Sequence, residues 1–145
     1  MAVTNKLSGQ FPHYLLEDVF GNITSSTIKC ALLTSAHTFN QETNDYWDDV
    51  SANEVSGTGY SAGGATLTSV TCAETTRVTT VDAADVSWGS STITAEYAVI
   101  YESIGAASAN PIIATIDFDG EKSSSSGTFQ ITFNASGILT ITVAA

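Results

Sequence analysis

The residues of this chain that could carry out chemistry are few and widely spaced. His13 and His37 are its only histidines, and Cys30 and Cys72 are its only cysteines. None of the four lies in the C-x-x-C or H-x-x-x-H spacing of zinc sites, so we expect neither a metal site nor a cofactor. Both cysteines are flanked by strand-like residues, and in a reducing cytosol we expect two buried thiols in preference to a disulfide.

The carboxylates are equally poor candidates for catalysis. Asp48 and Asp49 are adjacent, and neighbouring side chains point in different directions on a helix or a strand, so we interpret the pair as a solvated acidic turn. Asp117, Asp119 and Glu121 resemble half of a calcium loop but lack the flanking helices and the later glutamate, and we expect a hairpin turn there. Because no nucleophile can be paired with a base, we expect no enzymatic activity.

The most distinctive segment is residues 45–68, DYWDDVSANEVSGTGYSAGGATLT. Its glycines are not followed by the lysine of a P-loop, and they precede a strand instead of a helix. They therefore indicate backbone freedom and not a phosphate site. The acidic first half carries Tyr46 and Trp47, and the glycine-rich half carries Tyr60.

Two interpretations of these rings remain open. Trp47 can tuck under the loop as a small satellite core, or the rings can anchor a protein interface, where Trp and Tyr are enriched among binding hot spots. Trp88, in a strand-like context, is expected in the core or at a sheet edge. The candidate partner-binding residues are Tyr46, Trp47, Asp48, Asp49, Glu54, Tyr60, Phe11 and Tyr14.

The charge balance restricts the partners. The chain has fifteen acidic and four basic residues, which gives a net charge of -11. Because its Lys and Arg residues are not clustered, we expect no nucleic-acid partner. The acidic residues between Lys29 and Arg77 are either a solvated face or a patch complementary to a basic surface. No stretch approaches the roughly 20 apolar residues of a membrane span, and the first ten residues lack a signal-peptide core, so we expect no membrane partner and a cytosolic product.

Strand patterns dominate the chain. Alternating apolar residues predict that residues 93, 95, 97, 99 and 101 share one strand face toward a core, and further strands follow at 112–118, 129–133 and 139–143. Earlier strands are expected at 27–34, 65–72 and 77–81, with a weaker one at 86–88. Turn residues at 105–111, 119–127 and 134–137 separate the later strands, and such short connections favour antiparallel neighbours.

These patterns predict an all-β fold, a single antiparallel β-sandwich or jelly-roll-like barrel of about eight strands. Short helices are expected at residues 11–20, with Pro12 in the first turn, and at 43–50, with Thr43 as the N-cap. The first ten residues lack periodicity and are expected to form an arm that orders only on a neighbour. We therefore divide the chain into an arm at 1–22, which includes the first helix, and a β-sandwich domain at 23–145.

Three blocks carry a family resemblance: residues 27–35 (TIKCALLTS), residues 46–67 (YWDDVSANEVSGTGYSAGGATL) and residues 95–141, with AEYAVIYE, ANPIIATIDF and GTFQITFNASGILTI. The chain from Thr27 onward resembles a family of small tailed-bacteriophage virion proteins encoded among head genes. Some of these proteins are taken to be capsid decoration, or cement, proteins, and others are known only as virion proteins.

The resemblance implies a structural component of a phage particle, made in the host bacterial cytoplasm, and within the particle we expect a capsid decoration protein on the virion surface. Its partner would be the major capsid protein, whose subunits it would bridge with the arm and the Tyr46–Tyr60 loop. Copies gathered around a threefold position, most simply as a homotrimer, would gain avidity. Two alternatives stay open: a tail, neck or fibre-associated structural protein, and a carbohydrate-binding β-sandwich.

Overall fold

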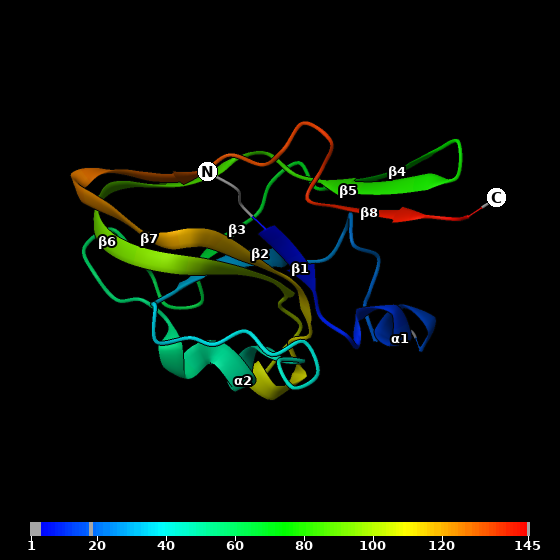
Figure 1. The fold of residues 1–145 in the computed structure, drawn as a ribbon, viewed down its shortest axis with the longest axis horizontal. Helices are drawn as coiled ribbons and strands as arrows, with labels where there is room; N and C mark the ends of the chain where they lie inside the picture. Colours follow the sequence, from blue (N-terminus) through cyan, green and yellow to red (C-terminus); the bar gives the residue numbers. More distant parts are fainter. Residues whose placement is uncertain (1–3, 18, 145) are drawn as a thin grey trace.

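The computed structural model describes residues 4–17 and 19–144, which fold into two antiparallel sheets and two short α-helices (Figure 1). The larger sheet has the strand order β1-β7-β6-β2-β3 and the smaller one the order β4-β5-β8. The predicted all-β, sandwich-like fold is confirmed. The elements are β1 (Thr4–Leu7), α1 (Phe11–Leu16), β2 (Ile28–Leu33), α2 (Trp47–Val50), β3 (Ala65–Thr66), β4 (Thr71–Thr75), β5 (Val78–Asp82), β6 (Val86–Glu102), β7 (Ile112–Ile131) and β8 (Leu139–Thr142).

The long β6–β7 pair connects the two layers. Figure 1 shows this ribbon turning back on itself, so that the end of β7 lies at the level of the small sheet. The strands bend where their register shifts. Glu96 alone lies opposite residues 118–121, between the pairs Ala95↔Lys122 and Tyr97↔Asp117, and Thr92 alone lies opposite residues 125 and 126. Extra residues of this kind increase the bend and the twist of a strand pair.

The expected turn at residues 119–127 was therefore wrong, because this segment is part of β7. Asp119, Gly120 and Ser126 do adopt positive φ angles, of 55°, 100° and 49°. Turn-forming residues are used here to build bulges in a continuous strand. The connections at 105–111 and 134–137 do separate strands as expected.

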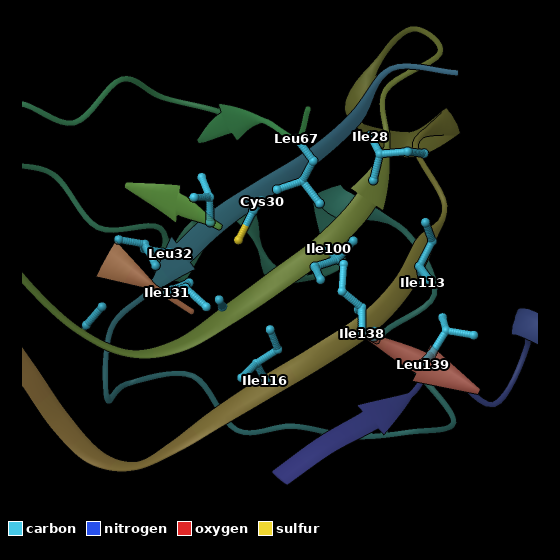
Figure 2. Packing of buried hydrophobic residues seen from close by; sticks show 14 of the residues in the cluster. Ile28, Cys30, Leu32, Leu67, Ile100, Ile113, Ile116, Ile131, Ile138 and Leu139 are labelled. Carbon is cyan, nitrogen blue, oxygen red and sulfur yellow. The ribbon is translucent and has the colours of Figure 1, made fainter. Parts of the chain in front are cut away.

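The main core lies between the two layers. Figure 2 shows Cys30 and Leu32 of β2, Ile100 of β6 and Ile116 of β7 together with Ile131 at the end of β7 and with Ile138 and Leu139 at the start of β8. Trp88 also belongs to this cluster and is 6% exposed, which confirms its expected core position.

The expected single core face along β6 was wrong. Ile93 and Ala95 contact the main core, but beyond the bulge at Glu96 the residues of that core are Ala98 and Ile100. A register shift of this kind changes which residues face the core. The other face of β6 packs into a second cluster made of Ala31, Leu33, Trp47, Val50, Val99, Tyr101 and Ile112.

The N-terminal segment differs from the expected arm. Thr4–Leu7 forms β1, which pairs with β7 from Thr4↔Asp117 to Leu7↔Ala114. α1 begins at Phe11, with proline in its first turn as expected, and it buries Phe11 and Tyr14 in the main core. Residues 4–16 are therefore built into the fold, and residues 1–3 lie outside the described residues.

Three local expectations also need correction. Residues 65–72 form parts of two strands, β3 and β4, instead of one. α2 has Tyr46 and not Thr43 as its N-cap. Both cysteines are free as expected, but only Cys30 is buried, and burial raises the pKa of its thiol to about 12. Cys72 lies exposed on β4.

Candidate partner-binding surface

The acidic and aromatic segment around α2 is held by its own residues. The Asp49 carboxylate accepts hydrogen bonds from the backbone N–H groups of Asp45 and Tyr46, at 3.0 and 2.9 Å. An acidic side chain at this position satisfies donors that the start of a helix leaves free. Asp49 is thus part of the helix cap, although its side chain remains exposed beside that of Asp48.

Trp47 fixes this segment to the large sheet. Its ring stacks on that of Tyr101 with centroids 4.8 Å apart and an interplanar angle of 6°, and the side chain is 7% exposed. It belongs to the second cluster, on the opposite face of the sheet from the main core. Of the two interpretations left open for Trp47, the satellite core is the one that the structure bears out.

Tyr60 and Glu54 form a structural hydrogen-bond network. The Tyr60 hydroxyl donates to Glu54 Oε1 at 2.7 Å and accepts from the Leu32 N–H at 3.0 Å. The same carboxylate oxygen accepts from the Gly63 N–H at 2.6 Å. Burial raises the pKa of Tyr60 above its ordinary value, and the hydrogen bond to the negatively charged Glu54 raises it further. These contacts tie the glycine-rich segment to β2.

Gly64 combines the expected backbone freedom with a close backbone approach that the sequence did not predict. Gly64 has a φ of +71°, and a Cβ added there would overlap the carbonyl oxygen of Cys30. The Tyr101 hydroxyl donates to the carbonyl of the preceding Gly63 at 2.8 Å. The segment lies directly on β2 and offers no phosphate cradle.

The predicted partner-binding set is therefore mostly framework. Phe11 packs edge-on against Phe20 at 5.3 Å, and Tyr14 contacts Tyr46 at 5.5 Å. Phe11, Tyr14 and Trp47 are buried, whereas Tyr46, Glu54 and Tyr60 are half-buried. Only Asp48 and Asp49 have exposed side chains, and the Asp49 carboxylate is already engaged in the helix cap, so a partner-binding role for the set rests mainly on Asp48.

No metal centre is evident in the part of the chain that the structure describes, where no three His, Cys, Asp or Glu side chains come together. At the calcium-like segment, the Lys122 ammonium donates to the carbonyls of Asp119 and Gly120, at 3.3 and 2.9 Å. Glu121 accepts instead from the Ser35 hydroxyl at 2.7 Å. The segment is a bulge closed by a lysine.

A projecting sheet is the surface that sequence reasoning missed. β4, β5 and β8 extend past the rest of the molecule (Figure 1), and all five side chains of β4 are exposed. Thr76 and Arg77, at φ angles of 52° and 68°, form the two-residue turn between β4 and β5. We call these three strands the overhang. Its short Thr-rich strands gave only a weak sequence signal.

Four exposed apolar side chains lie on α1 and at β8. Leu16 of α1 is 89% exposed and Val143, directly after β8, is 64% exposed. Leu15 and Ile141 are exposed to a lesser degree. Figure 1 shows α1 and β8 at one end of the molecule. These four residues are called the apolar end.

A groove of about 730 Å³ runs along the inner side of the bent β7 strand. Its floor includes Ile116, Phe118, Phe129 and Ile131, and Asn5 of β1 lines one side. All four floor residues are at most 7% exposed.

Comparisons with known proteins found no matching family model, no matching curated sequence and no matching solved structure. Among the described residues, no helix is long and apolar enough to cross a membrane.

Proposed function

We propose that this chain is a virion structural protein of a tailed bacteriophage, without enzymatic activity, that decorates the outside of the capsid. It binds the major capsid protein and bridges neighbouring subunits, which stabilises the shell against internal pressure. The resemblance of residues 27–141 to small virion proteins supports this assignment, and the observation that carries it is the overhang with its adjoining apolar end.

The overhang and the apolar end suit a contact with another protein. Leu15 and Leu16 of α1, with Ile141 and Val143 at β8, offer apolar side chains beside exposed strands. Contacts of this kind give modest affinity at each site, and repetition over a lattice multiplies their effect. Grouping around threefold positions, as a homotrimer, remains part of the proposal.

The acidic residues contribute at another part of the surface. Asp48 and Asp49 are exposed at α2, and the chain carries a net charge of -11. On the outside of a particle this charge opposes adhesion between particles, and it favours contact with a basic patch on a coat subunit. The buried rings of Trp47 and Phe11 act only by holding the fold.

A tail, neck or fibre position is the second candidate, since the same exposed surfaces would serve there. A carbohydrate-binding role receives no support, because Trp47 is buried and the Tyr60 hydroxyl is engaged within the protein. Copy number separates head from tail, since decoration requires a stoichiometry that matches lattice positions.

The decisive experiment adds the purified protein to capsids that lack it and measures bound copies against coat subunits. We expect saturation at a fixed lattice ratio. Ile141→Asp in the apolar end should weaken binding at least tenfold, whereas Ile104→Asp, at a residue that is 55% exposed in the β6–β7 connection, should bind normally. Fewer than about one bound copy per several coat subunits would refute decoration and favour the tail position.

A further inference from the structure

The outer edge of β4 is an open strand edge. β4 pairs with β5 through five consecutive residue pairs, from Thr71↔Asp82 to Thr75↔Val78, and no described strand pairs with its other side. All five of its side chains are exposed, so neither face of the strand is covered. Unpaired N–H and C=O groups on such an edge are a template for another strand.

The edges of the large sheet are blunted. The part of β7 that β1 does not cover is interrupted by bulges and carries Lys122. β1 itself carries Lys6. β3 is only two residues long. The second edge of the small sheet is β8, and the Asn5 amide donates to the Ile138 carbonyl at 3.0 Å directly before this strand begins. β4 has no proline, no lysine and no bulge, which are the usual protections of an edge.

The backbone groups at this edge belong to alternate residues. Because a two-residue turn leaves Thr75 and Val78 as a hydrogen-bonded pair, Ala73 and Thr71 also direct their backbone groups toward β5. Cys72 and Glu74 therefore direct their N–H and C=O groups away from β5.

We propose that β4 pairs antiparallel with β4 of a second copy of this chain, about a twofold axis at Ala73. In this register Cys72 lies opposite Glu74 of the other copy, and each such pair exchanges both of its backbone hydrogen bonds. Ala73 lies opposite its own counterpart in the closer, non-hydrogen-bonded pair, where its methyl group fits. The two overhangs then form one continuous six-stranded sheet.

The distribution of charge favours a second copy in this register. Glu74 is the only charged residue of β4, and its carboxylate accepts from the Arg77 N–H at 2.6 Å. Pairing about Ala73 places Glu74 opposite Cys72, whereas pairing about Glu74 would bring two carboxylates face to face, which is unfavourable. The contact is self-complementary, so it closes into a dimer and does not extend into fibres.

The contact is small. Two strands of five residues bury less than the about 1,200 Å² of a typical stable interface, so association in dilute solution is weak. It strengthens where copies are held close together, because the effective concentration then reaches about the millimolar range. The inference does not depend on the proposed function; on a shell it would join copies at neighbouring threefold positions.

Sedimentation of the purified chain at up to about 1 mM tests the pairing. We expect a concentration-dependent doubling of mass that Ala73→Lys abolishes, because it sets two ammonium groups face to face at the axis. Thr140→Lys on the opposite edge of the same sheet is the matched control and should associate normally. An unchanged association of Ala73→Lys with native β circular dichroism would overturn the proposal, as would no association of the native chain or a loss confined to Thr140→Lys.

A cross-linking pair tests the register. In a Cys72→Ser background, Ala73→Cys should give a disulfide-linked dimer with oxidised glutathione as the oxidant, because directly opposite non-hydrogen-bonded residues have Cα atoms about 4.5 Å apart. Thr75→Cys in the same background should not, since Thr75 would lie opposite Thr71 of the other copy. Equal cross-linking of the two variants would rule out the proposed axis.

Discussion

Trp47 shows how a ring with the sequence context of an interface anchor can serve the fold instead. It lies in an acidic loop, whose composition is compatible with a small satellite core and with an interface anchor. The deciding contact is with Tyr101, which is fifty-four positions away and reaches the loop only through the sheet. Nothing local in the sequence specifies this contact.

Trp47→Ala should lower the free energy of unfolding by about 3–5 kcal/mol, the range for removing a large buried aromatic side chain. Trp47→Phe should cost clearly less, because a smaller ring can still stack on Tyr101. Urea denaturation followed by circular dichroism measures both changes. An unchanged denaturation midpoint for Trp47→Ala would show that the loop does not depend on this ring.

His37 is the second residue whose role is hidden in the sequence. It was expected in a loop, and it is 3% exposed there, with its ring edge-on to Tyr97 at 5.2 Å. Its Nε2 atom is buried with no hydrogen-bond partner. Burial lowers the pKa of His37 below its ordinary value, so the folded state favours the neutral ring.

The free energy of unfolding should therefore decrease as the pH falls below about 6.5, the ordinary histidine pKa, because the unfolded chain then binds a proton that the folded chain excludes. The contribution of His37 is fully present above that pH and is lost as the pH approaches the lower folded-state pKa. His37→Gln should flatten this slope, and His13→Gln, on the exposed face of α1, should not. Equal slopes for His37→Gln and the native chain would contradict the assignment.

At the scale of elements, the sequence allowed the fold class and several strands to be predicted, because apolar alternation is a local signal. β2, β5, β8 and both short helices lie close to their expected positions. The continuous β7 strand was not predicted, because Asp119 and Ser126 are turn-forming residue types that this strand uses in bulges. Whether such residues end a strand or bend it depends on the opposite strand, which a local pattern does not contain.

Gly64 joins two elements, and its substitution tests that junction. Gly64→Ala should destabilise the chain by several kcal/mol, because the residue has a positive φ and its new Cβ would overlap the Cys30 carbonyl in β2. Gly105→Ala is the matched control, since a Cβ there meets no atom within 4 Å. Thermal unfolding compares the two, and similar midpoints would refute the close-approach argument.

At the scale of the whole molecule, the candidate site was the part least accessible to sequence reasoning. The segment around Trp47 was singled out for its unusual composition, and it proved to be framework apart from Asp48 and Asp49. The overhang passed unnoticed because exposure of β4 depends on which strands extend beyond the core. That property depends on how the strands are arranged in the folded chain, and the residues of β4 alone do not contain it.

Net charge is also a property of the whole molecule, and it carries the last prediction. Against a net charge of -11, the only contact between a basic and an acidic side chain at salt-bridge distance within residues 4–17 and 19–144 joins His13 to Glu17 at 3.1 Å, and it is an ion pair only when His13 is protonated. Repulsion among carboxylates should therefore outweigh attraction, and salt that screens it should stabilise the fold. Raising NaCl from 10 mM to about 150 mM, where the Debye length is about 8 Å, should raise the unfolding midpoint by a few degrees.

The control for this effect reduces the charge itself. Glu42 and Asp48 are exposed, and their carboxylates make no hydrogen bond within the described residues. The double variant Glu42→Lys/Asp48→Lys makes the net charge less negative by four, so it should unfold at a higher temperature than the native chain in 10 mM NaCl and respond less to added salt. A native chain that loses stability as salt is added would mean that attractive pairs dominate its surface, against the charge distribution described above.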